Sequence, residues 1–302
     1  MDWLQQLING LAQGSIYALI ALGYTMVYGV LRFINFAHSD VLMLGAFAAF
    51  FLAPVVGTIL PPQSYLGAFI IVIVSAAICA AIGILIERLA YRPLRNRPKL
   101  TVLITAIGVS LLIEFTCQHN AVFGARTRPF PRLIPEHNFH LGNIVIANHD
   151  VLVPIVTAAL LALLWLVVQR TKIGMAMRAV AFNPQAAALM GVNINRVISF
   201  TFGLGSALAA IAGILYAMRA PGIEPLMGIQ PGLRAFIAAV LGGIGNLPGA
   251  ALGGLLLGLL ETFAGGIPGI SNYRDGIAFA ILIFILLFRP AGLLGEVKTE
   301  KV

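Results

Sequence analysis

Long apolar runs alternate with short polar gaps along almost the whole chain of 302 residues. Crossing a hydrocarbon core of about 30 Å takes about 20 mostly apolar residues in a helix, and most of the runs are about that long. The runs lie at about 7–31, 37–60, 64–88, 100–118, 151–169, 197–218, 233–264 and 275–289. They are too long for the strands of a membrane barrel. The pattern therefore predicts an all-α transmembrane bundle.

The seventh run is too long for one straight crossing. Its stretch "GGIGNLPGA" contains glycines and Pro248, which would interrupt a helix near the middle of the membrane. If this run crosses twice, nine crossings with an external amino terminus are self-consistent. We expect a polytopic bundle with eight or nine crossings, some helices broken at mid-membrane, forming one transmembrane domain over residues 1–302. No signal-peptide cleavage site follows the first run, so we expect that run to be retained.

Composition supports a membrane protein, because 60% of the residues are hydrophobic and only 10% are charged. The net charge of +8 could suggest nucleic acid, but the basic residues lie in the gaps beside apolar runs, where they set orientation. Lys and Arg crowd the gaps 89–99 and 170–196, which we expect in the cytoplasm, with 119–150 outside. We expect contact with lipid and none with nucleic acid.

Enzymatic chemistry has no support in the sequence. No Gly-Lys dipeptide occurs, so the chain lacks the phosphate-binding loop of an ATPase. The five histidines lie mostly in the gap 119–150, and Cys79 and Cys117 match no metal-ligand spacing. We expect no catalytic residue, no metal and no cofactor.

One polar stretch, "RAVAFNPQAAALMGVNINRV" at 178–197, predicts a short helix outside the apolar runs. Asn183 can cap it, Pro184 suits its first position, and Gly191 can end it in a left-handed conformation. Its face is small and apolar. Such a helix at about 183–191 can insert into a groove of a partner protein or rest on lipid, and the pattern alone leaves both open.

The segment "QAAALMG" resembles the EAA loop of bacterial ATP-binding-cassette (ABC) importer permeases. In that family the loop is a coupling helix that docks on the cytoplasmic ATPase subunit. This chain has Gln185 where many members have Glu. The resemblance implies the following ATPase-coupling residues: Gln185, Ala186, Ala187, Leu189, Met190 and Gly191.

Longer blocks, among them "GSIYALIALGYTMVYGVLRFINFAHSDVLMLGA" and "AAVLGGIGNLPGAALGGLLLGLLE", are similar to the branched-chain amino-acid permease family, most of all to its shorter permease subunit. This implies a permease of the bacterial inner membrane that receives substrate from an external binding protein. Its other implied partners are ATPase subunits and a second, homologous permease. Permeases for urea and short amides share many of these blocks and remain an alternative substrate class.

Two polar segments are candidates for lining a transport pathway. In "RFINFAHSD", Asn35 and His38 belong either to an ordinary capped turn or to a discontinuous helix facing the pathway. In "GGIGNLPGAALGGLLLG", glycines at four-residue spacing indicate a close-packed helix seam, while Asn246 could line the pathway at the interruption.

Two carboxylates, Glu114 and Glu261, fall within or near apolar runs, where an ionised group is costly unless it is paired or faces a cavity. We expect Glu261 to form a structural ion pair with Arg274, across a short loop. The rival interpretation is a secondary transporter driven by an ion gradient, in which these carboxylates carry protons.

Overall fold

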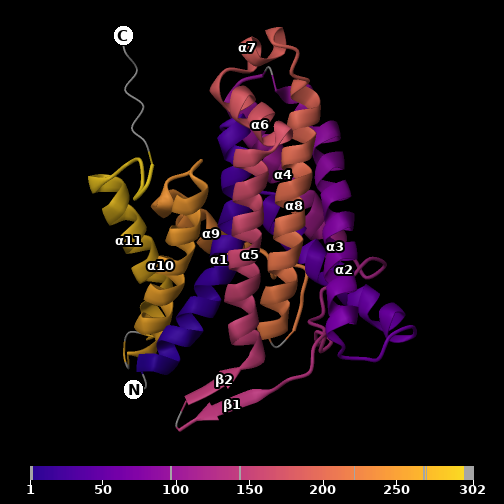
Figure 1. The fold of residues 1–302 in the computed structure, drawn as a ribbon, viewed down its shortest axis with the longest axis vertical. Helices are drawn as coiled ribbons and strands as arrows, with labels where there is room; N and C mark the ends of the chain where they lie inside the picture. The colour runs from indigo at the N-terminus through magenta and orange to yellow at the C-terminus, as the bar shows by residue number, and fades with distance from the viewer. Residues whose placement is uncertain are drawn as a thin grey trace.

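The computed structural model describes residues 3–95, 97–142, 144–220, 222–267, 269 and 271–295, and within them the chain is mostly helical. In chain order the elements are α1 (Trp3–Leu31), α2 (His38–Gly57), α3 (Tyr65–Ile86), the π-helical turn η1 (Glu87–Tyr91), the 3₁₀ turn η2 (Arg92–Leu94), α4 (Lys99–Gln118), β1 (Asn138–Leu141), β2 (Ile144–Ala147), α5 (Asn148–Arg170), α6 (Lys172–Phe182), α7 (Pro184–Leu189), α8 (Ile194–Arg219), α9 (Ile229–Gly242), α10 (Leu247–Gly266), the 3₁₀ turn η3 (Ser271–Tyr273) and α11 (Arg274–Phe288). Long helices run side by side. The amino terminus and the β1–β2 hairpin lie at one end of the bundle, and α6 and α7 at the other (Figure 1). We call these the hairpin end and the α7 end.

The apolar runs of the sequence form the predicted helices. Among the described residues, seven helices are long and apolar enough to cross a membrane, and α9 and α11 add two shorter apolar helices. The prediction of a polytopic helical membrane protein is therefore confirmed. Helix α6, an eleven-residue helix with one apolar face, was not predicted.

Helices α1 and α8 form the centre of the bundle. In the most apolar window of each, 83% of the residues are buried, against 17% in α4 and in α5. Small residues let α2 approach α8: a Cβ added to Gly45 would lie 2.3 Å from the Cα of Ala210, and one added to Gly213 would lie 2.1 Å from the carbonyl oxygen of Leu42. The outer helices α3, α4, α5 and α11 instead expose large apolar side chains, as suits contact with lipid or another membrane subunit.

The glycine seam predicted in the seventh apolar run is present, and it packs α10 against α1 and α9. A Cβ on Gly254 would lie 2.3 Å from the backbone nitrogen of Ala18, and one on Gly258 would lie 2.2 Å from the Cα of Gly14. Gly253 meets the carbonyl oxygen of Ala238 in α9 in the same way. Glycine is required along this seam because backbone touches backbone.

The interruption of that run does not lie at mid-membrane, so this part of the fold prediction is wrong. Residues 243–246 form a turn at the α7 end, with positive φ at Gly243 (+105°) and Gly245 (+98°), and the chain reverses from α9 into α10. Gly245, expected in the seam, belongs to this turn. The run is thus two antiparallel helices.

Two other helices do begin inside the bundle. The first residue of α2, His38, packs against Gly23 of α1, eight residues or about 12 Å before α1 ends. Helix α9 begins against the same region, because a Cβ on Gly228 would lie 2.1 Å from the carbonyl oxygen of Ser39. The amino-terminal ends of α2 and α9 therefore meet in the interior of the bundle.

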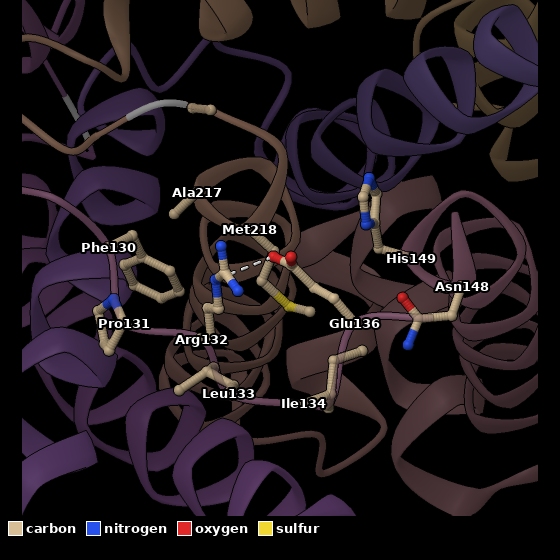
Figure 2. Close-up of a pocket in the computed structure, with 11 residues that line it drawn as sticks. Phe130, Pro131, Arg132, Leu133, Ile134, Glu136, Asn148, His149, Ala217 and Met218 are labelled. Atoms are coloured by element: carbon tan, nitrogen blue, oxygen red, sulfur yellow. Dashed lines mark ion pairs between the residues drawn. The ribbon is translucent and has the colours of Figure 1, made fainter. Parts of the chain in front are cut away.

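The segment 119–147 closes the hairpin end. Strands β1 and β2 pair antiparallel, and an isolated bridge joins Arg128 to Ile223 in the loop after α8. A pocket of about 240 Å³ lies between this segment and the ends of α5 and α8. Figure 2 shows its side chains, with the ion pair between Arg132 Nε and Glu136 Oε1 at 3.2 Å on its wall near Met218. The segment is thus fixed to the bundle by backbone and side-chain contacts.

Candidate coupling and translocation sites

Helix α7 stands beyond the long helices and is fixed by local contacts (Figure 1). The side chain of Asn183 accepts a hydrogen bond from the backbone N–H of Ala186 at 3.0 Å, and Pro184 occupies the first turn. At the other end Gly191 has φ +82°, and the backbone N–H of Val192 donates to the carbonyl of Ala187. Both caps expected from the sequence are present, around a helix shorter than the expected 183–191.

The faces of α7 differ in exposure. Ala187 is buried and faces the rest of the chain. Leu189 and Met190 are 89% and 84% exposed, and Phe182, just before the helix, is 84% exposed. Gln185, Ala186 and Gly191 are also exposed. The structure therefore presents three large apolar side chains around one short helix, with Ala187 on its inner side.

Helix α7 is connected closely to the bundle. After Gly191 the chain starts α8 at Ile194, where the side chain of Asn193 accepts from the backbone N–H of Arg196 at 3.1 Å. Before it, the guanidinium of Arg32, at the end of α1, donates to the carbonyl of Ala181 in α6 at 3.3 Å. The segment that contains α6 and α7 is thus joined to α8 by a short connection and to the end of α1 by a hydrogen bond.

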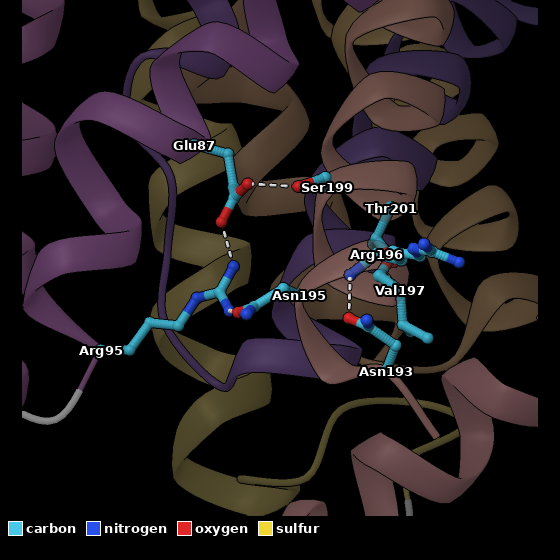
Figure 3. A network of polar contacts seen from close by, with 8 residues as sticks. All are labelled: Glu87, Arg95, Asn193, Asn195, Arg196, Val197, Ser199 and Thr201. Atoms are coloured by element: carbon cyan, nitrogen blue, oxygen red, sulfur yellow. Dashed lines mark hydrogen bonds and ion pairs between the residues drawn. The ribbon is translucent and has the colours of Figure 1, made fainter. Parts of the chain in front are cut away.

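A polar network links the start of α8 to the end of α3 (Figure 3). The carboxylate of Glu87, which is fully buried, pairs with Arg95 and accepts a hydrogen bond from Ser199 at 2.5 Å. Arg95 also donates to the side chain of Asn195 at 2.7 Å. Burial lowers the pKa of the Arg95 guanidinium and Glu87 opposes that shift, while a guanidinium stays protonated at physiological pH in any case. Sequence reasoning missed this network because its members come from segments about 100 residues apart.

The predicted pathway residues fall in two different places. Asn35 is buried and accepts a hydrogen bond from the hydroxyl of Tyr91 at 2.6 Å, and the ring of His38 packs on Tyr24 with centroids 4.6 Å apart. Both lie in the interior where α2 begins. Asn246 caps α10 by accepting from the backbone N–H of Gly249, and it borders a cavity at the α7 end.

That α7-end cavity has a volume of about 770 Å³ and lies between α1, α5, α6 and the α9–α10 turn. Its wall includes Arg32, Arg178, Trp165 and Asn246. Arg178 donates to the carbonyl of Val168, so its position is fixed by α5. The cavity therefore combines two guanidinium groups with the amino-terminal end of α10.

A second cavity, of about 650 Å³, opens at the hairpin end between α1, α5, α8 and α10. It is polar although the chain is apolar. Its lining consists of Gln6, Asn9, Gln13, Tyr17, His149, Asp150, Tyr216, Arg219, Ala220, Arg234, Glu261, Thr262, Gly265, Gly266 and Arg274. No single motif in the sequence indicates this cavity, because its polar residues are spread over six helices.

Glu261 lies in this hairpin-end cavity with a different partner from the one predicted. Its Oε1 is 3.0 Å from Nε of Arg234 in α9, and its Oε2 accepts from the hydroxyl of Tyr17 at 2.7 Å. Arg274, the expected partner, lines the same cavity. The expectation that Glu261 is paired is confirmed, and the sequence did not indicate Arg234, which the α9–α10 hairpin brings close.

Glu114 lies away from this cavity. It faces Asp40 at the start of α2, and the Asp40 carboxylate accepts a hydrogen bond from Ser110 of α4 at 2.5 Å. The described residues contain no group of three or more His, Cys, Asp or Glu side chains that could hold a metal ion.

A bundle of membrane-length helices, with a short helix presented beyond one end and a cavity at each end, is the architecture of a multi-pass membrane permease. Comparison with known proteins gives its family. The family described as branched-chain amino acid transport system / permease component matches residues 6–286. The chain belongs to this family.

Relatives of the chain span its whole length. It is 44% identical to the high-affinity branched-chain amino acid transport system permease protein BraD of Pseudomonas aeruginosa and 38% identical to LivH of Escherichia coli K12, in each case over 99% of this chain and 98% of the relative. It is 28% identical to the probable branched-chain amino acid transport permease protein LivH of Methanocaldococcus jannaschii, over 93% of this chain and 89% of the relative. No solved structure matches the chain.

Proposed function

We propose that this chain is the membrane-spanning permease subunit of an ABC importer that carries branched-chain amino acids across a bacterial inner membrane. Family membership over residues 6–286 supports the substrate class, since BraD and LivH are named for branched-chain amino acid transport. The observation that carries the mechanism is the exposed, doubly capped helix α7 joined to α8. The whole chain, residues 1–302, acts as one transmembrane domain.

The topology we propose has nine passes with the amino terminus outside. The shorter helices α9 and α11 count as passes in this scheme, although α9 begins inside the bundle and runs only to the α7 end. Basic residues support it: the α7 end carries the clusters around 88–99 and 170–196, and short basic loops face the cytoplasm. The tail 296–302, whose lysines bear on the same rule, lies outside the described residues, as does Asn96. Helix α7 is then cytoplasmic and the hairpin external.

The coupling function follows from the exposed side chains of α7. Leu189, Met190 and Phe182 would insert into a groove of the cytoplasmic ATPase, where their burial would stabilise docking by about 1.5–3 kcal/mol each if complete. Gln185 and Ala186 border the same surface, while Ala187 holds the helix on the bundle. The polar network of Glu87, Arg95 and Ser199 would transmit movement of α7 and α8 to α3.

The other partners in this proposal are a second, homologous permease and an external binding protein. The exposed apolar faces of α3, α4, α5 and α11 offer a surface for the second permease as well as lipid. The roles of the pathway residues stay predictions. Asn246 borders the α7-end cavity, and Asn35 and His38 lie where α2 begins inside the bundle, so they would move with that end of α2.

Site-specific cross-linking tests the coupling proposal. A photoreactive amino acid at Leu189 should cross-link to a co-purifying ATPase subunit, whereas the same group at Phe139, an exposed apolar residue on the hairpin, should not. Isolation of the complex from its native membrane should also yield a second permease. Transport that continues without any ATPase, driven by a proton gradient, would favour the secondary transporter. Preference for urea or a short amide over leucine in the reconstituted complex would change the substrate class alone.

A further inference from the structure

The hairpin-end cavity contains charges of both signs at two depths. Near its open end, Nη2 of Arg219 lies 3.1 Å from Oδ1 of Asp150. The cavity follows α1 from Gln6 to Tyr17, eleven residues or about 16 Å along the helix. At the inner level Glu261 pairs with Arg234 and accepts from Tyr17. Paired opposite charges thus line the cavity from the hairpin end toward the centre of the bundle.

These pairs differ from a purely structural ion pair of the same chain. Glu87 is fully buried and is held by Arg95 and Ser199 within the packed end of the bundle. The Arg219–Asp150 pair instead borders a space of about 650 Å³, within the range of small-molecule sites, and Nη1 of Arg219 is buried without a hydrogen-bond partner among the described residues. A guanidinium carries five donors, so Arg219 can bind a second carboxylate beside that of Asp150.

We infer that the hairpin-end cavity is a binding site for the charged backbone of a free amino acid, with Arg219 binding its carboxylate and Asp150 its ammonium group. This inference rests on the proposed function and extends it, because it names the part of the substrate that the permease holds. An amino acid carries one charge of each sign on groups bonded to the same carbon, and an Arg–Asp pair bordering a cavity presents the complementary signs side by side.

The lining also indicates what the site does not recognise. Among its described residues there is no leucine, isoleucine, valine or phenylalanine that could enclose a branched side chain. The small residues that line it are Ala220, Gly265 and Gly266. The site therefore binds leucine, isoleucine and valine through what they share, and discrimination among side chains is left to another component.

Ligand analogues test this assignment on the purified complex in lipid nanodiscs, without binding protein. Saturation-transfer NMR would measure the affinity for leucine, for 3-methylbutylamine, which lacks the carboxylate, and for 4-methylpentanoate, which lacks the ammonium group. Arg219→Gln should lower the affinity for leucine about tenfold and leave the affinity for the amine unchanged or higher. Asp150→Asn should lower the affinity for leucine about tenfold and leave the affinity for 4-methylpentanoate unchanged or higher.

Two control variants keep the test decisive. Arg219→Lys should recover part of the affinity because it keeps the positive charge. Arg126→Gln, the same change at an exposed arginine outside the cavity, should have no effect. The inference would be overturned if Arg219→Gln lowered the affinity for leucine and for both analogues equally, or did not lower the affinity for leucine at all. Failure of the unmodified complex to import leucine with ATP would instead overturn the proposed function.

Discussion

Replacing Gly191 with valine tests the coupling helix without disturbing the bundle. Gly191 has φ +82°, and a Cβ added there would meet no other atom within 4 Å, so the cost is backbone strain alone. That strain is about 1–3 kcal/mol for a β-branched residue. If it is relieved by distorting the end of α7, the docking-competent population falls by about 5- to 150-fold. Leu189 and Met190, which directly precede Gly191, would then be misplaced.

The assay compares transport, binding-protein-stimulated ATP hydrolysis and ATPase association in reconstituted vesicles. With Gly191→Val all three should fall together at normal membrane abundance, because the spanning helices bury their own apolar surface. Gly191→Asn should have a milder effect, since asparagine tolerates the left-handed conformation. Gly57→Val, at another glycine with open space but without positive φ, serves as the matched control. Unmodified transport with Gly191→Val would refute the reasoning.

Three further predictions concern packing and buried charge. Glu261→Gln and Arg234→Gln should each lower stability, and a double-mutant cycle measured by thermal melting in detergent should give a coupling free energy of about 1–3 kcal/mol. Additive losses of stability, or a shift in the pH dependence of transport with Glu261→Gln alone, would favour proton handling by the carboxylate. Gly258→Ala should destabilise the protein by about 1–3 kcal/mol, because the added Cβ meets the backbone of α1. Gly265→Ala in the same helix, where the added Cβ meets open space, should be neutral or slightly stabilising. Equal melting temperatures of the two variants would contradict the seam. Glu87→Gln should cost about 3–5 kcal/mol, since it leaves a half-buried guanidinium without its carboxylate, and a loss under 1 kcal/mol would contradict the network.

The features that sequence reasoning predicted correctly depend on neighbouring residues. Hydropathy located the spanning helices, and the caps Asn183 and Gly191 of α7 could be read directly because each acts within five residues of its own position. The glycine spacing in α10 likewise predicted a close seam, although only the structure shows that Gly254 and Gly258 face α1.

The features it missed depend on residues far apart in the chain. Tyr17 and Glu261 are 244 positions apart, and the sequence offered Arg274 as the nearest cation to Glu261, whereas the reversal at 243–246 brings Arg234 beside it. The turn itself was predicted as a mid-membrane break, because glycines and a proline signal an interruption but not its depth. The polar cavity has no local signature at all.

ATP-dependent accumulation of leucine in vesicles that contain the purified complex tests the central claim most directly. The complex would be reconstituted with α7, the end that cross-linking at Leu189 assigns to the ATPase, facing the vesicle interior. The binding protein would be added outside, and ATP would be either enclosed or absent. The account predicts uptake with enclosed ATP, abolished when the ATPase is removed and unaffected by dissipating an ion gradient. Leucine accumulation driven by an ion gradient in vesicles that lack the ATPase would contradict it.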